Sequence, residues 1–296
     1  MKNSLLSRLR KYNTRKQLFS LLFICPWIIG FVTLTLIPMA QSLIYSFSTT
    51  RTLAKGGIQL TPVGLENYYN VLFVDPTFKV NLGNFLQLMF FLVPIIVIFS
   101  LVIAVMLNTK MKGKRILRAI FFLPVILTSG PMLEQLHRIG ATQIQGLETF
   151  FVFSFIKDLP EVISSPILYI ARRFVYVLWF SGVQILVLLS GLQKVDQGIY
   201  EAARIDGASS WQSLFFITLP IMKPFILLTT IYTVVDISLS SLNGMQSQIK
   251  SKMFDSASGY GFSAAVSWLY FLLILGCVLV AWLILGRNSR ARRKNI

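Results

Sequence analysis

Apolar residues in this chain gather into six long runs separated by polar or basic intervals. Each run is close to the roughly 20 apolar residues that an α-helix needs to cross the hydrocarbon core of a bilayer. The first run exceeds the roughly 7–15 residues of a signal-peptide core, so it predicts an uncleaved helix. The pattern predicts an all-α membrane protein with one transmembrane domain over 18–286, whose six spans cover about 18–40, 85–107, 116–133, 174–192, 225–242 and 262–286.

Two intervals between the runs differ from simple loops. Residues 41–80 are mixed in character and predict an outside loop with short ordered pieces. Residues 134–173 alternate polar and aromatic side chains, which predicts an outside or interfacial amphipathic insertion. Pro94 and Pro124 fall inside runs, and neighbouring helices in a membrane satisfy the backbone groups that such prolines leave free.

Basic residues flank the runs asymmetrically. Of the 28 Lys and Arg, 19 lie in the N-terminal segment 1–17, the interval 108–118, the interval 193–224 and the tail 287–296. Six spans put both termini on one side, and an excess of Lys and Arg marks the cytoplasmic side. Both termini and 193–224 are therefore predicted to be cytoplasmic. The net charge of +17 is distributed as a membrane protein requires, so we expect no nucleic-acid partner.

Composition supports a membrane protein without its own catalytic chemistry. Only 13% of residues are charged, against about 25% in soluble domains, and the mean hydropathy is +0.69. Cys25 and Cys277 fall in apolar runs and imply neither a disulfide framework nor a metal site. The chain lacks a phosphate-binding Gly-x-x-x-x-Gly-Lys-Ser/Thr motif and has a single histidine, His137. We expect a non-enzymatic chain without a metal or cofactor of its own.

The polar interval 193–224 carries local signals for two helices joined at a corner. Asp196 suits the N-cap of a helix over about 197–206, and Gly207 suits the left-handed residue that ends it. Ser209 and Gln212 form a capping box that starts a second helix.

The two helices are expected to be short and to differ in their exposed faces. Ile199, Ala202 and Ala203 share one side of the first helix, with Glu201 and Arg204 more exposed. In the second, Pro220 and Pro224 are expected to end or kink the helix, because neither residue has an N–H to donate.

The same interval carries a family resemblance. Glu201-Ala202-Ala203, then three residues and Gly207, then nine residues and Ile217-x-Leu219-Pro220, match every position of the signature loop (EAA motif) of ABC importer permeases. Leu192-Gln193, Ala208 and Trp211-Gln212 around it resemble the carbohydrate type 1, maltose-type permeases. Further matches are Pro26-Trp27, Pro38, Ser46-Phe47 and Gly64-Leu65-Glu66-Asn67-Tyr68, so the resemblance covers most of the chain.

The resemblance implies a permease in the bacterial cytoplasmic membrane that imports sugars or oligosaccharides. Implied partners are a second homologous permease, two ABC ATPase subunits that bind ATP and Mg²⁺, an extracellular solute-binding protein and membrane lipid. The interval 193–224 is then the coupling loop, and Glu201 resembles the acidic residue that pairs with a basic group on the ATPase. The implied ATPase-coupling residues are Glu201, Ala202, Ala203, Asp206, Gly207, Ile217, Leu219 and Pro220.

Candidates for the sugar path lie in the fourth and fifth spans. In the fifth, Thr229, Thr233, Asp236 and Ser240 recur on one helix face, and Tyr232 precedes Asp236 by one turn. An ionisable group inside a span usually faces a cavity or a partner, and a carboxylate beside an aromatic ring suits a sugar. The alternative is that the hydroxyl residues only pack helices while Asp236 pairs with a neighbour. Weaker candidates in the fourth span are Trp179 and Gln184.

Two other functions stay open from the sequence. One is an ABC importer permease for another solute, such as an amino acid or phosphate. The other is an ion-coupled transporter, which predicts several intramembrane charges, whereas Asp236 is the only acidic residue well inside a span. Arg172 and Arg173 allow an acidic glycan such as a uronic-acid oligosaccharide, but they also suit an anchor at lipid headgroups.

Overall fold

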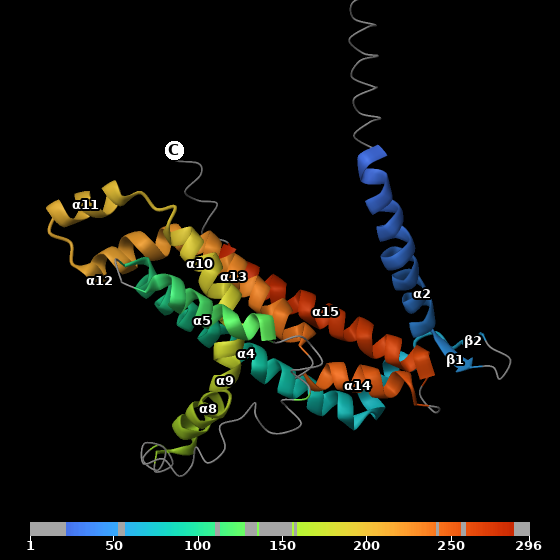
Figure 1. Cartoon of the computed structure of the whole chain (residues 1–296). Helices are drawn as coiled ribbons and strands as arrows, with labels where there is room; N and C mark the ends of the chain where they lie inside the picture. Colours follow the sequence, from blue (N-terminus) through green and yellow to red (C-terminus); the bar gives the residue numbers. More distant parts are fainter. Residues whose placement is uncertain are drawn as a thin grey trace, which may run out of the picture. The chain divides into compact units, whose positions relative to one another are not determined.

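The computed structural model describes residues 22–52, 57–109, 113–127, 135, 156, 159–240, 243–255 and 259–286 (Figure 1). The expectations for 1–17, His137, most of the 134–173 insertion, the end of the third span and the tail 287–296 lie outside these residues. The chain divides into two compact units, which are Met1–Val74 with Ser251–Trp268 and Asp75–Lys250 with Leu269–Ile296. Each unit is described by itself.

The first unit joins an apolar helix to a small hairpin. The helix spans Leu22–Ser46 and includes the π-helical segment η1 (Val32–Leu36) and α2 (Ile37–Ser46). Strands β1 (Ser48–Thr52) and β2 (Ile58–Pro62) pair antiparallel, and α3 (Glu66–Tyr69) and η2 (Asn70–Val74) follow.

Asn67 ties this hairpin to the end of α2. Its buried Nδ2 donates to the carbonyl oxygens of Ser46 and Ser48, each at 3.0 Å. The hydroxyl of Tyr68 lies 2.7 Å from that of Ser46. The expectation of short ordered pieces in 41–80 is confirmed, and two of the sequence matches quoted above, Ser46-Phe47 and Asn67-Tyr68, are in contact here.

The long helices of the second unit begin earlier than the hydropathy runs. Helix α4 covers Pro76–Asn108, starting well before the expected residue 85, because Asp75 accepts from the Thr77 amide at 2.9 Å and caps it. Helices α5 (Lys114–Leu127) and α13 (Leu219–Leu239) follow, and the boundaries between the two units fall inside α14 (Gly244–Met253) and α15 (Gly259–Gly286).

The expected fourth span is not one straight helix. Helix α8 (Glu161–Arg172) and α9 (Phe174–Phe180) meet at a bend of 52°, and α10 (Gly182–Leu192) follows after Ser181 (Figure 1). The break at Ser181 lies inside the expected run 174–192, and the 52° bend lies just before that run. Hydropathy reports apolar content and not the direction of a helix axis, so it could show neither. Residues 161–172, expected to belong to an insertion, form the first arm of this bent pair.

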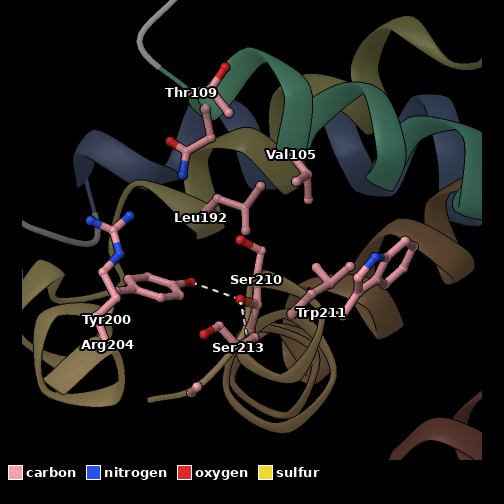
Figure 2. Close-up of a pocket in the computed structure, with 12 residues that line it drawn as sticks. Val105, Thr109, Leu192, Tyr200, Arg204, Ser210, Trp211 and Ser213 are labelled. Carbon is pink, nitrogen blue, oxygen red and sulfur yellow. Dashed lines mark hydrogen bonds between the residues drawn. The ribbon is translucent and has the colours of Figure 1, made fainter. Parts of the chain in front are cut away.

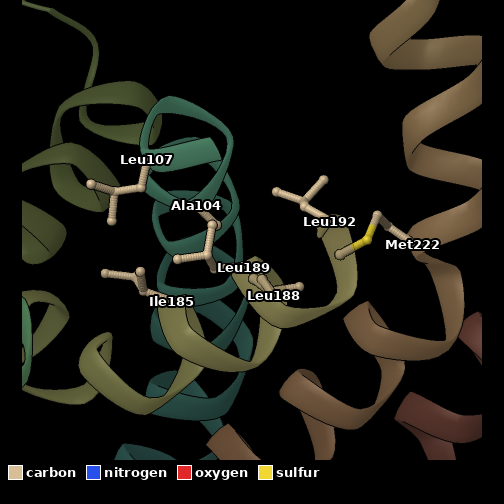
Figure 3. Packing of buried hydrophobic residues seen from close by; sticks show 7 residues of the cluster. All are labelled: Ala104, Leu107, Ile185, Leu188, Leu189, Leu192 and Met222. Atoms are coloured by element: carbon tan, nitrogen blue, oxygen red, sulfur yellow. The ribbon is translucent and has the colours of Figure 1, made fainter. Parts of the chain in front are cut away.

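One buried apolar cluster of the second unit lies where α10 packs against α4 and α13 (Figure 3). Its buried members are Ala104, Leu107, Ile185, Leu188, Leu189, Leu192 and Met222. In a bilayer, helix association depends on close packing rather than on escape from water. Gly191 provides such a contact, since a Cβ added there would lie 2.6 Å from Cγ of Phe225 on α13.

A polar network fixes α14 to the start of α4. Gln248 donates to Asp75 Oδ2 at 2.8 Å and accepts from Asn81 Nδ2 at 2.9 Å. These three side chains bring residues more than 160 positions apart in the sequence into one buried or half-buried cluster.

Four described helices are long and apolar enough to cross a membrane. They are Leu22–Ser46, Pro76–Asn108, Ser210–Met253 and Gly259–Gly286, and the bent pair α8–α9 would be a fifth. The chain is a mostly helical, multi-pass membrane protein.

Candidate functional site

The first helix of the polar corner, α11 (Gln197–Ile205), forms as its capping residues predict. Asp196 has extended backbone, and its Oδ1 accepts from the Gly198 amide at 2.9 Å. Of the three residues predicted to share one side of this helix, Ala203 is buried, whereas Ile199 and Ala202 are exposed. The prediction of an exposed Glu201 and Arg204 is confirmed.

The corner is held by backbone hydrogen bonds around Gly207. The amide of Ala208 donates to the Ala203 carbonyl at 2.9 Å, and that of Gly207 donates to Arg204 at 3.1 Å. This pair defines a Schellman motif, whose left-handed residue is Gly207 with φ +81°. A Cβ added to Gly207 meets no atom of the described chain within 4 Å. The glycine is therefore favoured here by the backbone conformation and not by crowding within this subunit.

The second helix begins at the predicted capping box but does not stay short. Ser209 Oγ accepts from the Gln212 amide at 3.2 Å, while Gln212 Oε1 accepts from the Ser209 amide at 2.7 Å. Helix α12 (Ser210–Gln212) continues through the π-helical segment η4 (Ser213–Thr218) into α13. The prediction is that Pro220 and Pro224 end or kink the helix, and neither ends it. Pro220 occupies the first turn of α13, where a missing N–H costs little, and Pro224 lies inside α13.

A hydrogen bond between two side chains stabilises the corner, and no local sequence pattern predicts it (Figure 2). Thr218 donates to the Ser213 carbonyl at 3.2 Å, so the Tyr200 hydroxyl donates to Thr218 Oγ1 at 2.9 Å. This bond joins α11 to the π-helical segment across 18 residues of sequence. A cavity of about 450 Å³ adjoins it, between the end of α4 (Val105, Thr109) and the corner (Arg204, Trp211).

The corner exposes large apolar side chains beside polar ones. Ile205 is 87% exposed, Trp211 70% and Phe216 76%, and the Trp211 ring stacks on Phe215 at a centroid distance of 5.8 Å. Exposed apolar groups gathered on a polar loop are typical of a protein–protein contact. Among the implied coupling residues, Glu201, Ala202, Asp206 and Gly207 are exposed, Ala203 is buried, and Ile217, Leu219 and Pro220 are half-buried.

Four of the candidate sugar-path residues lie together between α10 and α13. Gln184, 1% exposed, donates to Thr233 Oγ1 at 3.2 Å and also hydrogen-bonds to Asp236. Thr233 is fully buried and donates to the Thr229 carbonyl at 2.8 Å. The hydroxyl of Thr229 has no hydrogen-bond partner in the described residues. Asp236 is half-buried, so it alone of these is accessible from outside the helix pair.

The remaining candidates lie apart from this cluster. Tyr232 is 41% exposed, and half-buried Trp179 packs against the Tyr176 ring at 6.3 Å. Ser240 is not on the helical face, because α13 ends at Leu239 and Ser240 has an extended backbone. It lines a separate cavity with Tyr176.

The arrangement of helices is shared with a solved transporter. One chain of a crystal structure of a bacterial alginate ABC transporter, in complex with its alginate pentasaccharide-bound periplasmic protein, matches with a TM-score of 0.62. The match covers 95% of this chain and 96% of that chain at 17% identity. The fold is that of an ABC transporter permease.

No family model matches the chain. Its sequence relatives show the kind of ABC transporter permease to which it belongs. The arabinooligosaccharides transport system permease protein AraP of Halalkalibacterium halodurans is 33% identical over 233 residues, which are 77% of this chain and 71% of AraP. The lactose transport system permease protein LacF of Rhizobium radiobacter is 30% identical over 72% of this chain and 70% of LacF. The chain belongs to the permease subunits of sugar ABC transport systems.

Proposed function

We propose that this chain forms half of the translocation path of an ATP-driven importer of sugars or oligosaccharides. A second homologous permease supplies the other half, and an extracellular solute-binding protein delivers the substrate. ATP and Mg²⁺ are bound by two separate ABC ATPase subunits. The protein lies in a bacterial cytoplasmic membrane with six spans and both termini in the cytoplasm, as the distribution of Lys and Arg indicates.

The observation that carries this proposal is the corner 193–224. A loop that transmits movement between two packed arrangements must be stiff. The Schellman motif at Gly207, the capping box at Ser209 and the hydrogen bond from Tyr200 to Thr218 each restrain the corner. Its exposed Glu201 and apolar side chains form the surface that we assign to the ATPase contact.

ATP binding closes the ATPase dimer in this mechanism and draws two docked corners together. The movement passes through η4 into α13, because the helix runs without interruption from Ser210 to Leu239. Helix α13 carries Asp236, which Gln184 orients from α10. The sugar path therefore includes Asp236, with Tyr232, Thr229, Thr233, Ser240, Trp179 and Gln184 as its further candidate residues.

The test is purification of the tagged chain from its native membrane, followed by reconstitution in proteoliposomes. We expect an ATPase and a second permease to co-purify, and a sugar-loaded binding protein to stimulate ATP hydrolysis. Uptake that proceeds without ATP would favour an ion-coupled transporter instead. Labelling of a cysteine introduced within 201–220 from outside the cell would refute the coupling role.

A further inference from the structure

A small cavity lies where α4, α9, α13 and the start of α14 meet, within the second unit. Its volume is about 190 Å³. At about 30 Å³ for each water in the liquid, it holds about six waters, the space of one sugar ring rather than of a whole oligosaccharide. The lining combines the rings of Phe85 and Phe180 with the polar side chains Asn84, Arg173, Tyr176, Ser240 and Asn243.

Arg173 is the charged group of this cavity. It lies between α8 and α9 at their 52° bend, and its Cζ is 3.8 Å from the centroid of the Tyr169 ring. Stacking uses the face of the guanidinium and leaves its in-plane N–H donors for a partner, the geometry that binds a carboxylate with two parallel bonds. None of the described lining residues is Asp or Glu.

Another part of the wall is already fixed by internal hydrogen bonds. Asn243 donates to the Tyr270 hydroxyl and accepts from the Met245 amide at 3.1 Å. Tyr270 donates to the Ser238 carbonyl at 2.8 Å, and its ring meets Phe85 edge to face at 5.1 Å. A wall held in this way keeps its shape when a ligand enters, which lowers the entropic cost of binding.

The cavity lies at the end of α13 that is distant from the coupling corner. Ser240 directly follows α13, whose 21 residues separate it from the corner by about 30 Å. Asp236, on the last full turn before Ser240, does not line the cavity and is hydrogen-bonded by Gln184.

We propose that this cavity is a subsite for a carboxylated sugar, one hexuronate unit of an oligosaccharide, whose carboxylate is bound by Arg173. The aromatic rings contact the apolar face of the sugar, and Asn84 and Ser240 face its hydroxyl groups. The inference rests on the proposed function and narrows its substrate class to acidic oligosaccharides.

The experiment compares matched pairs of glycans on the assembled transporter in nanodiscs, with its ATPase, second permease and binding protein. The probes are the trimers of galacturonate, glucuronate and mannuronate, each beside its neutral, carboxyl-reduced counterpart. Stimulated ATP hydrolysis is measured for the wild type, Arg173→Gln and Arg173→Lys. Any preference of the binding protein is common to all variants, so a change in the acidic-to-neutral ratio reports on the permease.

We expect at least one acidic trimer to stimulate more strongly than its neutral counterpart. Arg173→Gln lowers the response to that trimer about tenfold, the factor of one charge-assisted hydrogen bond, and leaves the neutral response unchanged. Arg173→Lys keeps the charge but not the paired donors, so its acidic-to-neutral ratio of stimulated hydrolysis should fall between those of the wild type and Arg173→Gln. This variant keeps the test decisive if Arg173→Gln does not assemble. Arg172→Gln is the matched control, because it removes the same charge one residue away and does not line the cavity.

Three results would overturn the subsite. Stronger stimulation by neutral trimers would refute it while supporting sugar import. An acidic preference unchanged in Arg173→Gln and Arg173→Lys would place recognition elsewhere. An equal loss of both responses in Arg173→Gln, dependent on anionic lipid, would assign Arg173 to a lipid headgroup. Failure of every glycan to stimulate hydrolysis would instead count against the proposed function itself.

Discussion

The close contact between Gly191 of α10 and Phe225 of α13 gives a quantitative prediction for Gly191→Ala. The added Cβ would lie 2.6 Å from Cγ of Phe225 and 2.8 Å from both Cδ atoms. Cγ is the atom that attaches the ring, so turning the ring about its own axis does not relieve the clash. Either the χ1 angle of Phe225 changes or the two helices separate.

The expected loss of stability is about 1–2 kcal/mol. Overpacking of a close-packed interior costs about 1–3 kcal/mol, and the higher helix propensity of alanine returns up to about 1 kcal/mol. The ring has further contacts, since it packs against the buried cluster of α4 and α10 and its centroid lies 5.6 Å from Lys194 Nζ. It therefore has little freedom to move away.

The assay is the temperature at which purified, detergent-solubilised complex loses its monodisperse elution. Gly276→Ala in α15 is the control, because a Cβ there meets no atom of the described chain within 4 Å. We expect Gly191→Ala to lose its elution peak at a lower temperature than the wild type, and Gly276→Ala to match the wild type or exceed it.

A second substitution separates the clash from other effects of Gly191→Ala. Phe225→Leu removes the ring atoms that the new Cβ would meet, so the double variant should recover part of the loss, with a coupling of about 1 kcal/mol. Equal melting of Gly191→Ala and Gly276→Ala, or strict additivity in the double variant, would refute the packing argument.

Three further predictions concern coupling and the sugar path. Gly207→Asp places a side chain on a backbone at φ +81° within the proposed ATPase contact surface. The variant should insert into the membrane normally but lose both transport and stimulated ATP hydrolysis in proteoliposomes. Normal transport would contradict the coupling role. Tyr200→Phe removes one hydrogen bond to Thr218, worth about 1 kcal/mol, and should weaken stimulation of hydrolysis without reducing membrane insertion; stimulation equal to the wild type would show that the brace is dispensable. Asp236→Ala leaves Gln184 without one acceptor and should change the dependence of ATP hydrolysis on oligosaccharide; an unchanged dependence would remove Asp236 from the path.

The local structure of the corner could be predicted because each signal acts over a few residues. Asp196, Gly207 and the pair Ser209–Gln212 each satisfy backbone groups within one turn of themselves. The path of the chain after the corner could not be predicted in the same way. The rule that proline ends a helix considers Pro220 alone. In the structure, the π-helical segment η4 precedes α13, and Pro220 lies in the first turn of α13.

Contacts between distant residues were the other part that the sequence did not show. Gln184 and Asp236 were both candidates, yet nothing in their spacing of 52 residues linked them. The cavity around Arg173 and Tyr176 also includes Asn84 and Asn243 from two distant places in the chain. Only the packing of α4, α9 and α13 brings these residues together.

In the proposed mechanism the helical stretch from Ser210 to Leu239 would act as a lever, and the close contact between Phe225 and Gly191 would be its pivot. Measured along the axis, the corner end is about 22 Å from Phe225 and Asp236 is about 16 Å from it on the other side. A tilt of about 10° about that point moves the corner by about 4 Å and Asp236 by about 3 Å in the opposite direction. If the ATPase contacts the corner as proposed, a displacement of the corner would move Asp236 about three quarters as far and in the opposite direction.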